Sequence, residues 1–118
     1  MKWNKLDKEV VLRLVSEKEI GAYCLGTFIT GSHEVKYVGR SDNNLRNRLL
    51  NHAREGKYVY FAFWTTKTII EAYYKECELF HNHNSAVNKM HPDAPRNLPY
   101  FCPFCLTHKN FEQLMEVV

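Results

Sequence analysis

Residues 58 to 66, "YVYFAFWTT", are the segment that most constrains how this chain can fold. The run is apolar and aromatic through Trp64 and lacks the polar–apolar alternation of a half-exposed strand. Its length and aromatic content predict a β-strand that is buried on both faces. Because a small sheet cannot cover its own faces, helices from the rest of the chain must pack on it.

The remaining segments supply two more strands and three helices. Residues 21 to 29, "GAYCLGTFI", and residues 34 to 40, "EVKYVGR", have the composition of hairpin strands, and the turn signal "TGSH" joins them. Helices are predicted over residues 5 to 17, from a cap among Asp42, Asn43 and Asn44 to Gly56, and from Thr68 to about His81. The expected fold class is α+β, a small three-stranded antiparallel sheet sandwiched by helices.

A chain of 118 residues is expected to form a single domain. Residues 1 to 20 hold the N-terminal helix, and residues 21 to 90 hold the sheet and the later helices. Residues 91 to 118 differ, because all four prolines of the chain fall there. This extension is predicted to be irregular or extended, with a short closing helix over residues 110 to 117.

The overall composition is that of a water-soluble globular protein, with 45% apolar and 25% charged residues. No segment has the length of apolar chain that a membrane helix needs, and the N-terminus lacks the apolar core of a secretory signal. A cytoplasmic location is therefore expected, where the four cysteines would stay reduced.

Positive charge is concentrated in one part of the chain. The net charge is +3, and residues 36 to 57 hold two acidic residues and six basic ones: Lys36, Arg40, Arg46, Arg48, Arg54 and Lys57. Such a zone suits a phosphate-bearing partner, although a solvated helix face would have the same composition.

Two predicted helices carry polar residues on their apolar sides. Arg48 and His52 are one turn apart, on the face that Leu45 and Leu49 share. Glu76 lies on the inward stripe of the third helix, where a carboxylate is costly without compensation. It is either a boundary residue, for example one paired to Arg48, or a metal ligand or catalytic acid.

The hairpin brings further polar groups to the same end of the sheet. Tyr23 and Tyr37 lie on its two strands, and each taken alone is typical of strand packing. Packing does not explain why both tyrosines should lie at the same end of the sheet as Arg40, Arg48, His52 and Glu76.

These motifs together resemble the GIY-YIG nuclease family, which includes the catalytic domains of homing endonucleases, excision-repair incision subunits and some restriction enzymes. "GAY" at 21 to 23 and "YVG" at 37 to 39 match the two halves of its signature, with Ala22 and Val38 as apolar variants. "RSDNNLRNRLLNH" and "EAYYKECELF" match the helical motifs that follow. Asn88 falls twelve residues after Glu76, where family members carry an asparagine. The resemblance covers about residues 20 to 90.

The resemblance implies a catalytic set and a cofactor. Glu76 would bind one Mg²⁺ or Mn²⁺, and the guanidinium of Arg48 would bind the phosphate. Tyr23, assisted by the positive charges of Arg40 and Arg48, or else His52, would activate water. Tyr37 and Asn88 would position the reacting groups.

The implied partner is nucleic acid, with DNA expected first and RNA left open. The residues expected on its backbone are Arg40, Arg46, Arg54 and Lys57. A homodimer would allow both strands of a duplex to be cut. The alternative is a non-catalytic nucleic-acid-binding or interaction module that keeps the same fold.

The cysteines near the C-terminus raise the question of zinc. Cys102 and Cys105 form a C-x-x-C pair, His108 follows, and His81, His83 and His91 could come near. Because only one ligand pair has recognisable zinc spacing, the sequence favours small buried cysteines under a Pro-rich flap. We therefore expect the chain to fold without zinc, with Cys24 and Cys77 as core residues.

Overall fold

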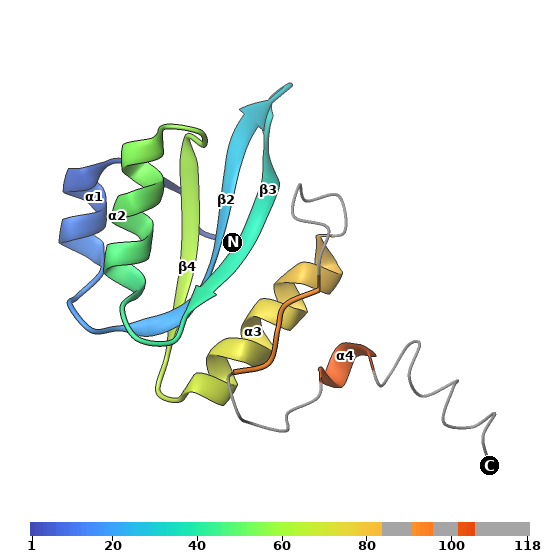
Figure 1. The fold of residues 1–118 in the computed structure, drawn as a ribbon. Coiled ribbons are helices and arrows are strands. Elements are labelled where there is room, and N and C mark those ends of the chain that lie inside the picture. The colour runs from blue at the N-terminus through green and yellow to red at the C-terminus, as the bar shows by residue number, and fades with distance from the viewer. Residues whose placement is uncertain (84–90, 96–101, 106–118) are drawn as a thin grey trace, which may run out of the picture.

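An antiparallel four-stranded sheet in the order β1-β4-β2-β3 forms the centre of the computed structural model, which describes residues 1–83, 91–95 and 102–105 (Figure 1). Its strands are β1 (Asn4–Lys5), β2 (Ile20–Ile29), β3 (Ser32–Ser41) and β4 (Tyr60–Thr66). β2 lies between β3 and β4, so both of its edges are paired, and Ala22 and Tyr23 are fully buried. β3 lies at the edge of the sheet, so among the described residues no further strand pairs with its outer side.

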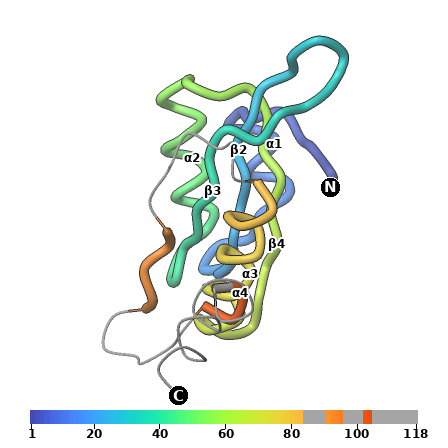
Figure 2. The backbone as a smooth tube through the Cα atoms, turned by 90° about the vertical axis from the view of Figure 1, so that its right-hand side faces the viewer, coloured from blue at the N-terminus to red at the C-terminus, as the bar shows by residue number. Residues whose placement is uncertain are grey.

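A tight two-residue turn joins β2 to β3. Thr30 and Gly31 have φ angles of 50° and 82°, and Ile29 pairs directly with Ser32. Positive φ at both positions gives a turn whose twist matches that of the flanking strands. The turn is therefore shorter than the predicted "TGSH". The tip of the hairpin projects beyond the helices in both ribbon and tube views (Figures 1 and 2).

The N-terminal segment differs from the prediction of one helix over residues 5 to 17 and of a three-stranded sheet. Asn4–Lys5 form the fourth strand, β1, which pairs with β4. The helix α1 covers only Lys8–Leu14. Asp7 caps the N-terminus of this helix, because its carboxylate accepts a hydrogen bond of 2.9 Å from the Val10 amide. A two-residue strand is too short to show an alternation of polar and apolar residues. The sequence pattern therefore could not distinguish these residues from the helix that follows.

The two later helices follow the sequence prediction. α2 (Leu45–Glu55) begins at Asn44, whose side chain accepts the Asn47 amide, and ends at Gly56 with a φ of 68°. α3 (Ile69–Asn82) begins at Thr68, which caps its first turn. The helices cover opposite faces of the sheet, with α1 and α2 on one side and α3 on the other (Figure 1).

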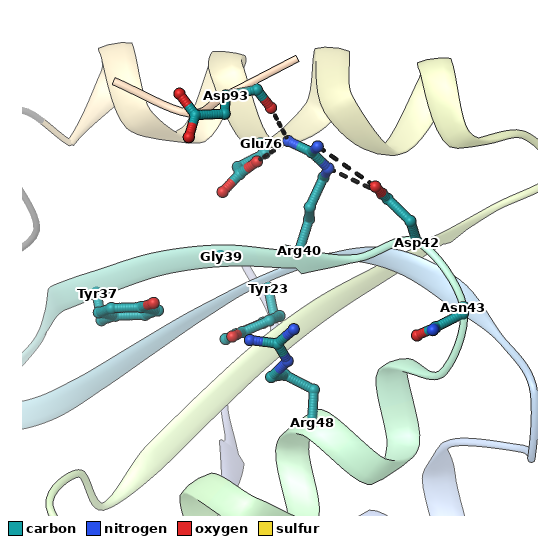
Figure 3. A pocket seen from close by; sticks show the side chains of 9 residues that line it. All are labelled: Tyr23, Tyr37, Gly39, Arg40, Asp42, Asn43, Arg48, Glu76 and Asp93. Atoms are coloured by element: carbon teal, nitrogen blue, oxygen red, sulfur yellow. Dashed lines mark hydrogen bonds and ion pairs between the residues drawn. The ribbon is translucent and has the colours of Figure 1, made fainter. Parts of the chain in front are cut away.

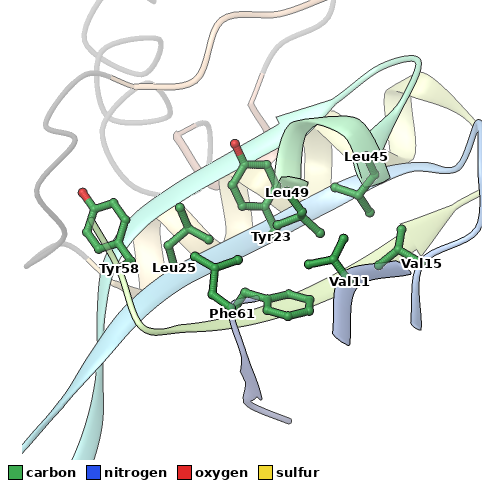
Figure 4. Close-up of a cluster of buried hydrophobic side chains, with 9 residues drawn as sticks. Val11, Val15, Tyr23, Leu25, Leu45, Leu49, Tyr58 and Phe61 are labelled. Atoms are coloured by element: carbon green, nitrogen blue, oxygen red, sulfur yellow. The ribbon is translucent and has the colours of Figure 1, made fainter. Parts of the chain in front are cut away.

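Each face of the sheet has its own apolar layer. The layer under α1 and α2 contains Leu6, Val11, Val15, Tyr23, Leu25, Leu45, Leu49, Tyr58 and Phe61 (Figure 4). The layer under α3 contains Ala22, Cys24, Val35, Val38 and Leu79. On β4, Phe61 and Ala62 point to opposite faces and are both buried. The predicted burial of residues 58 to 66 on both faces therefore holds only for the middle of the strand, because Val59 and Thr65 are exposed.

A third, smaller cluster joins α3 to the C-terminal segments. Tyr73, Cys77 and Cys102 are buried there, beside Ala94 and Phe104. The short helix α4 (Pro103–Cys105) therefore packs on α3. Within the residues described, no helix is both long and apolar enough to cross a membrane. The helix predicted over residues 110 to 117 lies outside the described residues.

Candidate active site

A pocket of about 360 Å³ opens beside β3, where side chains from the two faces of the sheet come together (Figure 3). Its lining is contributed by β2, β3, the loop between β3 and α2, α2, α3 and the segment after α3: Tyr23, Tyr37, Gly39, Arg40, Asp42, Asn43, Arg48, Glu76 and Asp93. Tyr23, Tyr37 and Arg48 lie on the side of α2, and Arg40 and Glu76 lie on the side of α3. The pocket therefore wraps around the edge strand.

Gly39 makes this arrangement sterically feasible. It pairs with Tyr23 across the hairpin, and the tyrosine ring lies directly over it. A Cβ atom at residue 39 would lie 2.5 Å from Tyr23 Oη, closer than real contacts allow, and 3.0 Å from Tyr37 Cε1, closer than most real contacts. A glycine is needed here because the backbone must leave room for both tyrosine rings.

Tyr23 and His52 form a hydrogen-bonded pair at one wall of the pocket. The distance from Tyr23 Oη to His52 Nε2 is 2.9 Å. Burial raises the pKa of Tyr23, outweighing the attraction of Arg48, and burial lowers the pKa of His52. At neutral pH the tyrosine is therefore protonated and the imidazole is neutral, so the hydroxyl donates to Nε2. The expected lowering of the Tyr23 pKa by neighbouring arginines is not found, because desolvation dominates.

The remaining ring nitrogen of His52 faces a carboxylate. Nδ1 is buried without a hydrogen-bond partner among the described residues, and Glu55 Oε2 lies 3.8 Å from it. With the lone pair of Nε2 directed at Tyr23, Nδ1 carries the proton. The carboxylate of Glu55 would then stabilise an imidazolium if His52 took up a second proton.

Arg40 is held by acidic groups on the α3 side of β3. Its Nη1 donates to Glu76 Oε1 and to the Asp93 carbonyl, each at 2.7 Å, while its Nε donates to Asp42 Oδ1 at 2.8 Å. Its guanidinium also lies 5.2 Å from the centre of the Tyr73 ring. Arg40 was predicted to contact nucleic acid, but here its charge is already compensated by two carboxylates.

Glu76 is 9% exposed and faces the pocket, as its place on the inward stripe predicts. Burial raises its pKa, Arg40 opposes that shift, and Asp42 and Asp93 add to it. Its salt bridge is to Arg40, at 2.7 Å, and not to Arg48 as one interpretation of the sequence supposed. Figure 3 shows the second carboxylate oxygen turned away from Arg40.

Arg48 has a different environment from Arg40. Within the described part of the chain, its guanidinium makes no ion pair or side-chain hydrogen bond, and it lies beside Tyr23 (Figure 3). It also lines an adjoining cavity of about 310 Å³ that His52 shares. An uncompensated guanidinium at the mouth of a pocket is suited to bind an anion.

The other predicted backbone-binding residues lie away from this pocket. Arg46 pairs with Glu17 at 3.4 Å, on the α1 side of α2. Arg54 lines a separate cavity between α1 and α2, and the Lys57 amine sits 5.7 Å from the centre of the Tyr58 ring. The structure therefore does not gather all the basic residues at one place.

The residues around Glu76 fit a single Mg²⁺ or Mn²⁺ ion. A buried carboxylate with one oxygen directed away from Arg40, close to two further carboxylates, offers the hard oxygen donors that these ions prefer. Among the described residues, no group of three metal-ligating side chains occurs at this pocket. The ion would therefore keep several water ligands, as Mg²⁺ commonly does.

Two predicted residues cannot be placed, and several others were not foreseen. Asn88 and His108 lie outside the described residues. Gly39 was identified only as part of a motif, and Asp42 and Asn43 only as helix caps. Asp93 reaches the site from the Pro-rich segment, and no local sequence pattern marks a residue that acts through its backbone carbonyl.

A second cluster of metal-ligating side chains lies under α3. Cys77, His91 and Cys102 each place a ligand atom within 4.8 Å of the others, so this cluster could bind a metal ion. The sequence singled out Cys102 but paired it with Cys105 and His108, and it assigned Cys77 to the core. The side chain of Cys105 is not among those described.

No protein-family model, no curated protein and no solved structure gives a significant match to the chain. The resemblance to the GIY-YIG nucleases therefore stays a prediction that depends on the sequence motifs.

Proposed function

We propose that the protein is a metal-dependent nuclease that hydrolyses phosphodiester bonds of DNA in the pocket beside Gly39. The observation that supports this most is the convergence of Tyr23, Tyr37, Arg48 and Glu76 on one pocket, with His52 bonded to Tyr23. These residues come from four different elements. Packing alone gives no reason for their polar groups to meet around an edge strand.

Arg48 is the residue proposed to bind the scissile phosphate. Its guanidinium lines the pocket and pairs with no carboxylate of residues 1–83, 91–95 or 102–105, so it can present two parallel N–H donors to phosphate oxygens. Arg40 cannot do the same without leaving Glu76 and Asp42. We therefore assign Arg40 to holding Glu76 in place, and Arg48 to charge stabilisation at phosphorus.

Tyr23 and His52 are proposed to activate water together. Because burial raises the pKa of Tyr23, a free tyrosinate is a poor candidate for the base. The 2.9 Å hydrogen bond offers another route, in which the tyrosine oxygen accepts a proton from water as its own proton passes to His52 Nε2. Glu55 then faces the imidazolium that forms.

Glu76 is proposed to hold the divalent ion. When bound, the ion would supply charge neutralisation at the phosphate and the leaving oxygen. The negative potential of Asp42 and Asp93 favours a cation at this position.

A non-catalytic nucleic-acid-binding module is the second candidate. The observation that favours it is the salt bridge of 2.7 Å between Glu76 and Arg40, since a buried carboxylate with such a partner needs no metal. This candidate predicts binding through Arg48 that does not depend on Mg²⁺.

The two candidates are separated by incubating the protein with labelled duplex DNA, branched DNA, single-stranded DNA and RNA. Each substrate is tested with Mg²⁺, with Mn²⁺ and with excess chelator. The nuclease proposal predicts cleavage of at least one DNA substrate that the chelator abolishes. Binding without cleavage of any substrate under all three conditions would contradict it.

A further inference from the structure

The cluster under α3 contains a fourth side chain that could act as a metal ligand, that of His81. His81 Nε2 lies 3.5 Å from Cys102 Sγ, and the His81 and His91 rings are 5.2 Å apart between centroids. His81 follows Cys77 by one helical turn, so both project from the same face of α3. Two thiols and two imidazoles therefore gather where α3 meets residues 91–95 and 102–105.

One spacing in this cluster matches that of a tetrahedral metal site. With Zn–S bonds of about 2.3 Å and Zn–N bonds of about 2.0 Å, neighbouring ligand atoms in a tetrahedron lie about 3.3 to 3.8 Å apart. The separation between Cys102 and His81 falls in this range, and the ligand atoms of Cys77, His91 and Cys102 all lie within 4.8 Å of one another. Side-chain movements would have to bring the other ligand atoms to these distances around an ion.

A backbone carbonyl fixes the tautomer of His91. Its Nδ1 lies 2.8 Å from the Pro92 carbonyl oxygen, which can only accept, so Nδ1 carries the proton and Nε2 keeps its lone pair. A backbone carbonyl in this role is the usual way in which a protein sets the tautomer of a ligating histidine.

Burial of the cluster favours a structural site over an open one. Cys77 is 0% exposed and Cys102 is 5% exposed, and Phe104 packs beside them. Small buried cysteines would account for the thiols, but not for the two half-buried imidazoles that lie beside them. Soft thiolates combined with imidazoles are ligands that select zinc over magnesium or calcium.

We propose that Cys77, His81, His91 and Cys102 form a structural Zn²⁺ site that fastens residues 91–95 and 102–105 to α3. None of the four lines the pocket beside Gly39, so the site does not depend on the proposed nuclease function. It does support the pocket, because Asp93, two residues after His91, accepts the 2.7 Å hydrogen bond from Arg40. The sequence alone favoured folding without zinc, since it paired Cys102 with Cys105 and left out Cys77.

The first test is elemental analysis of the full chain purified without chelator, for which we expect one zinc per chain. The metal is then removed and the protein titrated with Co²⁺ alone. We expect a thiolate-to-cobalt charge-transfer band and the visible spectrum of a tetrahedral site, both saturating at one equivalent. Glu76→Gln should give the same spectrum, which separates this site from the magnesium site of the proposed nuclease.

Variants identify the ligands. Cys102→Ser and His81→Asn should bind Co²⁺ at least about tenfold more weakly than the wild type. Cys24→Ser, at a buried cysteine on β2, and His83→Asn, just beyond α3, should bind it as the wild type does.

Three results would overturn the proposal: a folded wild-type chain without metal and without the charge-transfer band, unchanged affinity in Cys102→Ser, or a Cys77–Cys102 disulfide in the metal-free folded protein. If the ligand variants fail to fold, the wild-type and Glu76→Gln spectra still decide the matter, because only thiolates give the band.

Discussion

At the scale of single residues, two arginines near the pocket have opposite environments. Arg40 donates to two carboxylates and a carbonyl, whereas Arg48 has no such partner among the described residues. The sequence shows both as basic residues in one zone, and it cannot tell which charge is already compensated. The structure makes Arg48 the better candidate for contact with phosphate.

The first prediction concerns this arginine. Arg48→Lys keeps the positive charge but loses the planar fork of donors. If Arg48 binds the phosphate in the transition state, kcat and kcat/KM should both fall by roughly 10²–10³, with little change in KM. Arg54→Lys, on the same helix but lining a different cavity, is the matched control and should cleave normally. A full-speed Arg48→Lys would mean that the wrong arginine is assigned.

His52 gives the second prediction, a pH dependence of stability. Its pKa is lowered by burial, with Tyr23 Oη, Arg48 and Glu55 as the polar groups around it. The folded protein therefore resists protonation at a pH where the unfolded chain, with a pKa near 6.5, already takes up a proton. This contribution to stability is present above about pH 6.5 and is lost as the pH falls through the lowered pKa.

Chemical unfolding of wild type and His52→Gln between about pH 5 and 7.5 measures this contribution. The wild type should lose more stability than the variant as the pH falls. His33→Gln, in the exposed hairpin, should follow the wild-type curve. Parallel curves for wild type and His52→Gln would contradict the effect.

At the scale of elements, the register of the β2–β3 hairpin sets the site. Tyr23 lies opposite Gly39, so Tyr23, Tyr37 and the glycine meet on the α2 face, while Arg40 points to the α3 face. A slip of one residue would reverse these directions. The pocket therefore depends on the pairing of two strands as much as on the identity of its residues.

The third prediction tests this pairing. Gly39→Ala places a methyl group 2.5 Å from Tyr23 Oη, which should cost about 1–3 kcal/mol of stability as the ring is displaced. In a Tyr23→Ala background the same change should cost much less, because the obstructing ring is gone. Denaturant unfolding of the two single variants and the double variant gives the coupling. Strictly additive costs would show that the ring does not lie over Gly39.

Much of this architecture could be predicted from the sequence. The hairpin, α2 with its Gly56 stop, the middle of β4 and the inward place of Glu76 follow from periodicity and caps. β1 could not be predicted, because two residues carry no period. The Asp93–Arg40 bond and the Cys77–Cys102 contact could not be predicted either, since they join distant segments without a local signal.

At the scale of the whole molecule, basic residues are spread over more than one surface. Arg48 lies at the pocket, whereas Arg46 and Arg54 line other cavities along α2. If DNA is the partner, Arg54 can contact only a phosphate distant from the cleaved bond. Such contacts contribute affinity through counterion release and do not contribute to the chemical step.

The fourth prediction follows from this separation. Arg54→Ala should weaken binding and reduce the slope of log Kd against log salt concentration by about 0.9. Its single-turnover rate at saturating protein should equal that of the wild type. Fluorescence anisotropy over a salt series measures the slope. A slower chemical step in Arg54→Ala would place this residue in the site.

The cleavage rate of Glu76→Gln tests the central proposal most directly. The amide keeps the size of the side chain and can still accept a hydrogen bond from Arg40, but it lacks the charge that holds the metal. The matched control is Glu78→Gln, on the same helix, which loses only a 3.0 Å pair with Lys75 at the surface. Under single-turnover conditions with Mg²⁺ and labelled DNA, Glu76→Gln should be at least about 100-fold slower than wild type, and Glu78→Gln should match it. A folded Glu76→Gln that cleaves at the wild-type rate would contradict the proposed site.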